Sequence, residues 1–197
     1  PAASRRVLSW IMSLRDAVLA ALVDGEMSGY DLSKAFDATV ANFWTATPQQ
    51  LYRELDRMDR DEVISARLVE QDGRPNKRLF SLTDKGRAAL RQVSHRQPKL
   101  PAIRDEHLVA IHALEAGDLE PMTDAIRERM QLSRDKLARY DRMAHRLLDG
   151  RTETEFLATA DRIGPYLTLM RGRMFEEESL RWGARVLEVL DTRAGRR

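Results

Sequence analysis

The N-terminal part of the chain carries apolar side chains at helical spacing. Over residues 14–23 they recur at i, i+3, i+4, i+7 and i+8, which predicts a helix with one buried face, and Gly25 is a typical residue for ending it. A second short helix is predicted to begin with Ser28 as its N-cap and to carry its apolar residues up to Phe36. A connector over residues 37–46 follows.

A third helix is predicted to begin after Thr47 and to run to about Met58. Thr47 can accept a hydrogen bond as N-cap, and Pro48 suits the first helical position because its missing N–H is not needed there. Leu51, Leu55 and Met58 share one face of this helix. Three short helices separated by such breaks are typical of a helix-turn-helix unit.

The hydrophobic period then changes from that of a helix to that of a strand. Residues 64–71 and 78–82 alternate apolar and polar side chains, and the segment 72–76 between them contains Gly and Pro. This pattern predicts a β-hairpin, with Thr83 beginning a fourth helix that runs to about Ser94. The order of three helices, a hairpin and a helix is that of a winged helix-turn-helix.

The second half of the chain shows helical patterns throughout. Helices are predicted over 105–116, 119–148 and 153–191, the last one broken at Gly164-Pro165. We therefore expect a mainly α protein with a winged helix-turn-helix DNA-binding domain over 1–95, a linker over 96–104 and an all-α helical dimerisation domain over 105–197.

Composition excludes several classes of protein. The 197 residues contain no cysteine and four scattered histidines, so a metal site is not expected. There is no Gly-rich phosphate loop, nucleophile motif or clustered set of catalytic side chains, which argues against an enzyme and gives no reason to expect a cofactor. We find neither a membrane span nor a signal peptide, and we expect a cytoplasmic protein.

Charge is nearly balanced over the chain but not along it. The 33 basic and 31 acidic residues give a net charge of +2, whereas residues 67–91 contain seven basic against three acidic residues. Such a local excess suits phosphate binding. The third helix also carries four acids that would repel phosphate, and we predict that they lie away from the DNA groove: Glu54, Asp56, Asp59 and Asp61.

Three segments resemble the PadR family of bacterial regulators: residues 29–32, 47–55 and 73–86. Residues 171–182 look like the long final helix of the subfamily with a larger C-terminal domain. One departure is Glu62-Val63-Ile64, where the family often carries Gly-Leu-Ile. The resemblance implies a DNA-binding transcriptional regulator, expected to be a repressor, and the alternative is a MarR-like winged-helix regulator of another family.

A winged helix places its third helix in the major groove and its wing on the backbone or minor groove. Glutamine can bond adenine and arginine can bond guanine, so we expect base contacts from the start of that helix. The predicted DNA-binding residues are Gln49, Gln50 and Arg53 in the groove, Tyr52 on a phosphate, and Arg74, Lys77 and Arg78 on the wing. Tyr30 and Lys34 could contact the flanking backbone, with burial of Tyr30 in the core as the alternative.

The apolar stripes of the C-terminal helices need a partner, which predicts a homodimer on an inverted-repeat operator of double-stranded DNA. Its candidate residues are Leu167, Met170, Met174, Trp182 and Leu187, for which a role in the core of one chain is the alternative. The resemblance implies an apolar or aromatic small-molecule effector. The candidate aromatics for it are Trp10, Phe43, Trp44 and Tyr166, which could equally be core residues.

Overall fold

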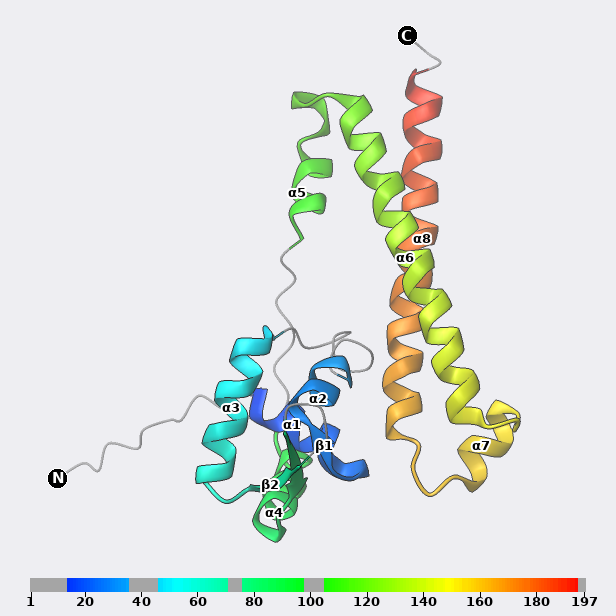
Figure 1. Cartoon of the computed structure of the whole chain (residues 1–197). Coiled ribbons are helices and arrows are strands. Elements are labelled where there is room, and N and C mark those ends of the chain that lie inside the picture. The colour runs from blue at the N-terminus through cyan, green and yellow to red at the C-terminus, as the bar shows by residue number, and fades with distance from the viewer. Residues whose placement is uncertain (1–13, 36–45, 71–75, 98–104, 195–197) are drawn as a thin grey trace, which may run out of the picture. The chain divides into compact units, whose positions relative to one another are not determined.

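The computed structural model describes residues 14–35, 46–70, 76–97 and 105–194 (Figure 1). The chain divides into two compact units, Pro1–Pro101 and Ala102–Arg197, and the division falls within residues 96–104. The fold is mainly helical with one small sheet, which confirms the predicted fold class. No helix in the described part of the chain is long and apolar enough to span a membrane.

The first unit contains the three predicted helices of the helix-turn-helix. They are α1 (Leu14–Ala21), α2 (Gly29–Ala35) and α3 (Pro48–Arg60), and a short 3₁₀ turn, η1 (Leu22–Asp24), follows α1. Their apolar faces meet in one core, because each helix contributes side chains that are almost completely buried. These side chains include Val18, Leu19, Leu22, Leu32, Leu51, Leu55 and Met58.

The wing is the hairpin of β2 (Ile64–Val69) and β3 (Lys77–Leu82), which pair in antiparallel register from Ile64 opposite Leu82 to Val69 opposite Lys77. A third strand, β1 (Met27–Ser28), pairs with the other edge of β3 and gives the order β1-β3-β2. The sequence did not predict β1, since two residues are too few to show an alternating pattern.

Helix α4 (Asp84–Val93) follows the wing and packs closely behind it. Thr83 is its N-cap, as predicted, and its hydroxyl accepts from the Gly86 amide at 3.1 Å and donates to the Glu62 carbonyl at 2.7 Å. Gly86 is required at this point because a Cβ atom there would collide with the Val63 carbonyl oxygen. The helix is therefore fixed to the turn that joins α3 to the wing.

The second unit consists of helices only: α5 (Glu106–His112), the 3₁₀ turn η3 (Leu114–Ala116), α6 (Leu119–Leu148), α7 (Glu153–Thr159) and α8 (Gly164–Ala194). The two long helices, α6 and α8, lie side by side along much of their length (Figure 1). One core forms around Tyr140, Phe156 and Tyr166, and another around Ile126, Met130 and Leu190.

A charged group lies between the two cores, at the contact of α6 with α8. The Glu176 carboxylate is 3% exposed, and it accepts hydrogen bonds from the Ser133 hydroxyl at 2.7 Å and from Lys136 Nζ at 2.8 Å. Burial, together with this carboxylate, raises the pKa of Tyr140. A buried carboxylate requires such partners, so the two helices are held in one register by a polar contact as well as by apolar packing.

Candidate nucleic-acid interface

Helix α3 begins with a complete capping box. The Thr47 hydroxyl accepts from the Gln50 amide at 3.2 Å, and Gln50 Oε1 accepts from the Thr47 amide at 2.9 Å. Thr47 and Pro48 therefore have the positions predicted for them. The bond from the Thr47 amide to Gln50 Oε1 was not predicted from the sequence. It engages the side-chain oxygen of Gln50, a residue that was predicted to contact bases.

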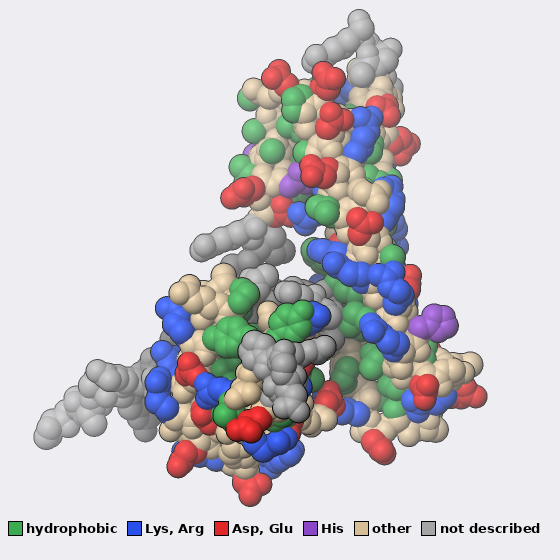
Figure 2. Space-filling view, viewed as in Figure 1, with side chains coloured by type: hydrophobic (Ala, Val, Ile, Leu, Met, Phe, Trp, Pro, Cys, Tyr) green, Lys and Arg blue, Asp and Glu red, His purple; other side chains and the backbone are tan. Residues whose placement is uncertain are grey.

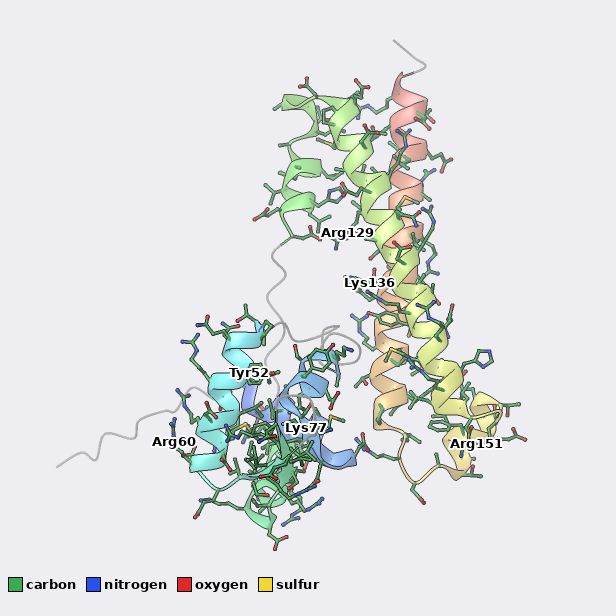
Figure 3. All side chains as sticks on the ribbon, in the orientation of Figure 1. Tyr52, Arg60, Lys77, Arg129, Lys136 and Arg151 are labelled. Carbon is green, nitrogen blue, oxygen red and sulfur yellow. The ribbon has the colours of Figure 1, made fainter. Side chains whose placement is uncertain are left out.

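The solvent face of α3 carries a basic stripe. Gln49, Arg53, Arg57 and Arg60 recur at helical spacing and are exposed, opposite the buried face formed by Leu51, Leu55 and Met58. Basic side chains line the outer edge of α3 in Figure 2, and Arg60 in Figure 3 points away from the body of the unit. Arg57 and Arg60 were not among the predicted contacts, although their spacing from Arg53 is visible in the sequence.

The acidic residues of α3 lie on both flanks of this stripe. Glu54 pairs with Arg57 at 3.5 Å on one flank, where Asp61 also pairs with Arg15 of α1 at 2.8 Å. On the other flank, Asp56 and Asp59 both pair with Arg78 of the wing, at 2.7 and 3.1 Å. Each of the four acids is thus paired with a base, which limits the repulsion of phosphate that they would otherwise cause.

Helix α3 ends in a turn that uses the left-handed conformation. The Val63 amide donates to the Met58 carbonyl at 3.1 Å and the Glu62 amide donates to the Asp59 carbonyl at 3.0 Å, which is the Schellman pattern. Glu62 has a φ of 58°. Glycine, which the family pattern implied by the resemblance has at this position, would adopt that conformation without steric cost.

Two tyrosines lie beside the start of α2. Tyr52 of α3 packs its ring over Gly29, where a Cβ atom would collide with it, and it remains 47% exposed (Figure 3). Tyr30 is 61% exposed, so the alternative that it is buried in the core is wrong. Lys34 Nζ lies 4.4 Å from the centre of the Tyr30 ring, and a hydrogen bond with Tyr30 raises the pKa of Lys34.

The two described wing residues that were predicted to contact phosphate have different surroundings. Lys77 is exposed at the start of β3 and has no ion pair with any described residue, whereas Arg78 is bound to the two aspartates of α3. Arg74 lies outside the described residues, as do Trp10, Phe43 and Trp44. Figure 3 shows Lys77 among the side chains of the hairpin. In the described ranges, no cluster of histidine and acidic side chains could hold a metal ion.

The residues predicted to form a dimer contact are divided between two faces of α8. Leu167, Met170 and Met174 are 41%, 37% and 57% exposed, and they share an outer face with Phe175, which the sequence analysis did not single out. Leu187 packs instead within the chain, against the core that contains Leu190, and Trp182 packs edge-on against His107 of α5. Tyr166 is 6% exposed and packs on Phe156.

Helix α3, with its exposed basic face, is joined to a two-stranded wing. This arrangement defines a winged helix-turn-helix protein, here followed by a helical domain. Residues 18–92 match the "Transcriptional regulator PadR-like family", and residues 103–191 match the "Virulence activator alpha C-term" family. The winged-helix part of the chain, residues 18–92, is thus of the PadR-like family of transcriptional regulators. The MarR-like alternative is therefore set aside.

Individual relatives agree with this assignment. The negative transcriptional regulator PadR of Bacillus subtilis is 25% identical over 179 residues, which cover 90% of this chain and 97% of that protein. A probable transcriptional regulator of Mycobacterium tuberculosis is 43% identical over 79 residues, 40% of this chain and 42% of that protein.

Solved structures show the same fold over most of the chain. Bacillus subtilis PadR, crystallised with operator DNA, has a TM-score of 0.74 at 25% identity, covering 89% of this chain and 97% of that one. The Vibrio cholerae virulence activator AphA has a TM-score of 0.65 at 26% identity, covering 91% and 99%. The similarity therefore includes the helical domain as well as the winged helix.

Proposed function

We propose that this regulator is a repressor that binds an inverted-repeat operator as a homodimer, with α3 in the major groove. The observation that carries the proposal is the exposed stripe Gln49–Arg53–Arg57–Arg60, on a helix whose acids are all paired. The structure of Bacillus subtilis PadR with operator DNA supports it, as does the name of that protein, a negative regulator.

The start of α3 supplies the base contacts in this proposal. The side-chain amide of Gln49 makes no hydrogen bond with any described residue, so both of its polar atoms are available to adenine. Arg53 Nε donates to the Gln49 backbone carbonyl at 3.4 Å, which leaves its two Nη groups for guanine. Gln50 uses its oxygen in the capping box and offers only its NH₂ group. Arg57 and Arg60, further along the stripe, meet phosphates.

The remaining contacts fix the protein on the backbone. Lys77 and Arg74 reach phosphates from the wing, and Tyr52 reaches one with its hydroxyl. Tyr30 and Lys34 contact the flanking backbone from α2, because both are exposed and Lys34 carries a positive charge. Such contacts strengthen binding to any sequence alike.

Pairing of two chains uses the outer face of α8, where Leu167, Met170 and Met174 are exposed beside Phe175. Exposed apolar side chains at this density on one helix favour burial against a second copy. Two paired chains would place their α3 helices about one DNA turn apart.

A small apolar or aromatic effector releases the DNA in this proposal. Bacillus subtilis PadR has been crystallised with p-coumaric acid, and we propose a ligand of the same chemical class here. Tyr166 is already packed in the core. The candidates for contacting the effector are therefore the three aromatics outside the described residues: Trp10, Phe43 and Trp44.

The test is binding to the DNA fragment that precedes the protein's own gene, measured by mobility shift. Gln49→Ala should lower the preference for this fragment over random duplex by roughly 5- to 150-fold for each half-site, the range of one good base contact, and the losses at the two half-sites multiply. Lys77→Ala should weaken binding to both, and should reduce the slope of log affinity against log salt by about 0.9 for each chain, or about 1.8 for the dimer. Gln92→Ala, an exposed glutamine of α4, is the matched control and should change neither.

Failure of the unaltered protein to bind either DNA at low salt would contradict the proposal. If Gln49→Ala lost affinity equally for both DNAs, the proposal that the protein binds DNA would stand, but the base-reading role of Gln49 would be contradicted.

A further inference from the structure

The guanidinium of Arg78, on the wing, binds two carboxylates of α3. Its Nη1 lies 2.7 Å from Asp56 Oδ1 and its Nη2 lies 3.1 Å from Asp59 Oδ2, so the two ends of one guanidinium bind carboxylates on successive turns of α3. The same group lies over the Phe80 ring, 5.1 Å from its centre. Each of the two Nη groups, which would face a phosphate in the predicted contact, thus already donates to a carboxylate within the chain.

The two carboxylates are close to the surface proposed to meet DNA. Asp56 lies between Tyr52 and Arg60 in one i, i+4 row of α3, directly beside the row of Gln49 and Arg53. Asp59 also accepts from the Ala66 amide of β2 at 3.1 Å. Without a counter-charge, these carboxylates would repel the phosphates that pass between α3 and the wing.

Stability does not explain this arrangement well. The side chains of Arg78, Asp56 and Asp59 are 45%, 54% and 33% exposed, and ion pairs exposed to this degree contribute little to folding. These charges would nevertheless affect the affinity for DNA, because several phosphates of a bound DNA lie close to this surface and are attracted or repelled by its local charge.

We propose that Arg78 promotes DNA binding by masking Asp56 and Asp59, as a positioning residue, and that it is not itself a phosphate contact. The neighbouring Lys77 differs in having no ion pair with any described residue, so the phosphate contact of this strand falls to Lys77. This inference rests on the proposed DNA binding, and it replaces the role that the sequence predicted for Arg78.

The experiment compares four proteins on the fragment that precedes the gene, by fluorescence anisotropy: the unaltered chain, Arg78→Ala, Asp56→Asn/Asp59→Asn and the triple variant that combines them. Arg78→Ala should weaken binding about tenfold, since it leaves two uncompensated carboxylates beside the DNA. The triple variant should return to within about threefold of the unaltered chain, and the aspartate variant should bind at least as tightly as that chain.

The control is Arg67→Ala on the same hairpin. Arg67 also pairs with an acid, Glu26, at 2.6 Å, but its side chain lies on the opposite face of the sheet from Arg78. It should change affinity by less than about twofold. Thermal unfolding followed by circular dichroism checks that each variant is folded, and Arg78→Gln, which removes the charge but keeps a longer polar side chain, replaces Arg78→Ala if that variant is not.

A triple variant as weak as Arg78→Ala would show that the guanidinium itself contacts DNA, and would overturn the masking role while leaving DNA binding established. Absence of binding by the unaltered chain at low salt is a different result, since it contradicts the proposed function and the masking role together.

Discussion

Glu62 is a residue whose backbone angle favours glycine over the side chain that this chain carries. It is the residue after the C-cap of α3, and its φ of 58° completes the two hydrogen bonds that end the helix. A residue with a Cβ atom pays a steric cost in this conformation that glycine does not. The side chain offers little in return, because its contact with Lys85 is 3.8 Å long and highly exposed.

Glu62→Gly should therefore stabilise the winged-helix unit. We expect the free energy of unfolding to rise by about 0.5–1 kcal/mol, the steric relief reduced by the greater freedom of glycine in the unfolded chain. Urea unfolding followed by circular dichroism measures it. Glu62→Gln removes the charge but keeps the Cβ atom, so it should leave stability unchanged, and an equal gain in that variant would show that charge is responsible.

Single residues were predictable from the sequence where their role is local. Thr47 and Thr83 cap their helices as expected, because an N-cap depends on the next three residues alone. The pairing of Arg78 with Asp56 and Asp59 was not predictable, since it joins residues about twenty positions apart whose contact depends on how the hairpin lies against α3.

At the scale of elements, length decided what the sequence could predict. Helix α6 has the bounds expected from its pattern, 119–148, and Pro121 lies in its first turn, where its missing N–H is tolerated. The strand β1 has two residues and exists only because β3 offers a free edge beside it. Its formation is a tertiary effect that no short pattern could show.

The pairing of α6 with α8 gives a prediction at this scale. Lys136→Met would leave the Glu176 carboxylate buried with only the Ser133 hydroxyl as a partner. We expect a loss of about 1–3 kcal/mol in the free energy of unfolding, below the value for a fully buried pair because the Lys136 side chain is 42% exposed. Urea unfolding at one fixed protein concentration measures it, since association also contributes to stability.

A second substitution separates charge from packing in this experiment. Glu176→Gln in the Lys136→Met background removes the unpaired charge while keeping a polar group for Ser133, and should recover most of the loss. If the double variant were as unstable as Lys136→Met, the lost contacts of the lysine stem would be the cause, and the ionic explanation would be wrong.

At the scale of the whole molecule, the exposed surface of α8 is the part of the helical domain that enters the proposed pairing on DNA. The sequence predicted apolar residues for pairing but did not show which face of the helix is buried. Leu187 turned out to pack inside the chain, whereas Met170 and Met174 are exposed. At 3.6 residues per turn Leu187 lies about 140° around α8 from Met174, so the spacing puts them on different faces, and the position of α6 decides which face is covered.

Met174 is the most exposed of the predicted pairing residues, at 57%, and is the position at which to test the dimer. Met174→Glu should convert the dimer to a monomer, because a carboxylate at the centre of an apolar contact must be desolvated without a partner. Met174→Leu keeps an apolar side chain of similar volume and should remain dimeric. Sedimentation equilibrium distinguishes the two states.

The same pair of variants tests whether pairing serves DNA recognition. A dimer binds both halves of an inverted repeat at once, so its second contact is made at a high effective concentration. Met174→Glu should consequently lose about 100-fold or more in affinity for the inverted repeat, while its affinity for an isolated half-site stays that of one winged-helix unit. A monomeric Met174→Glu protein that still bound the inverted repeat as tightly as Met174→Leu would show that the winged helix acts alone, and that the outer face of α8 serves another partner.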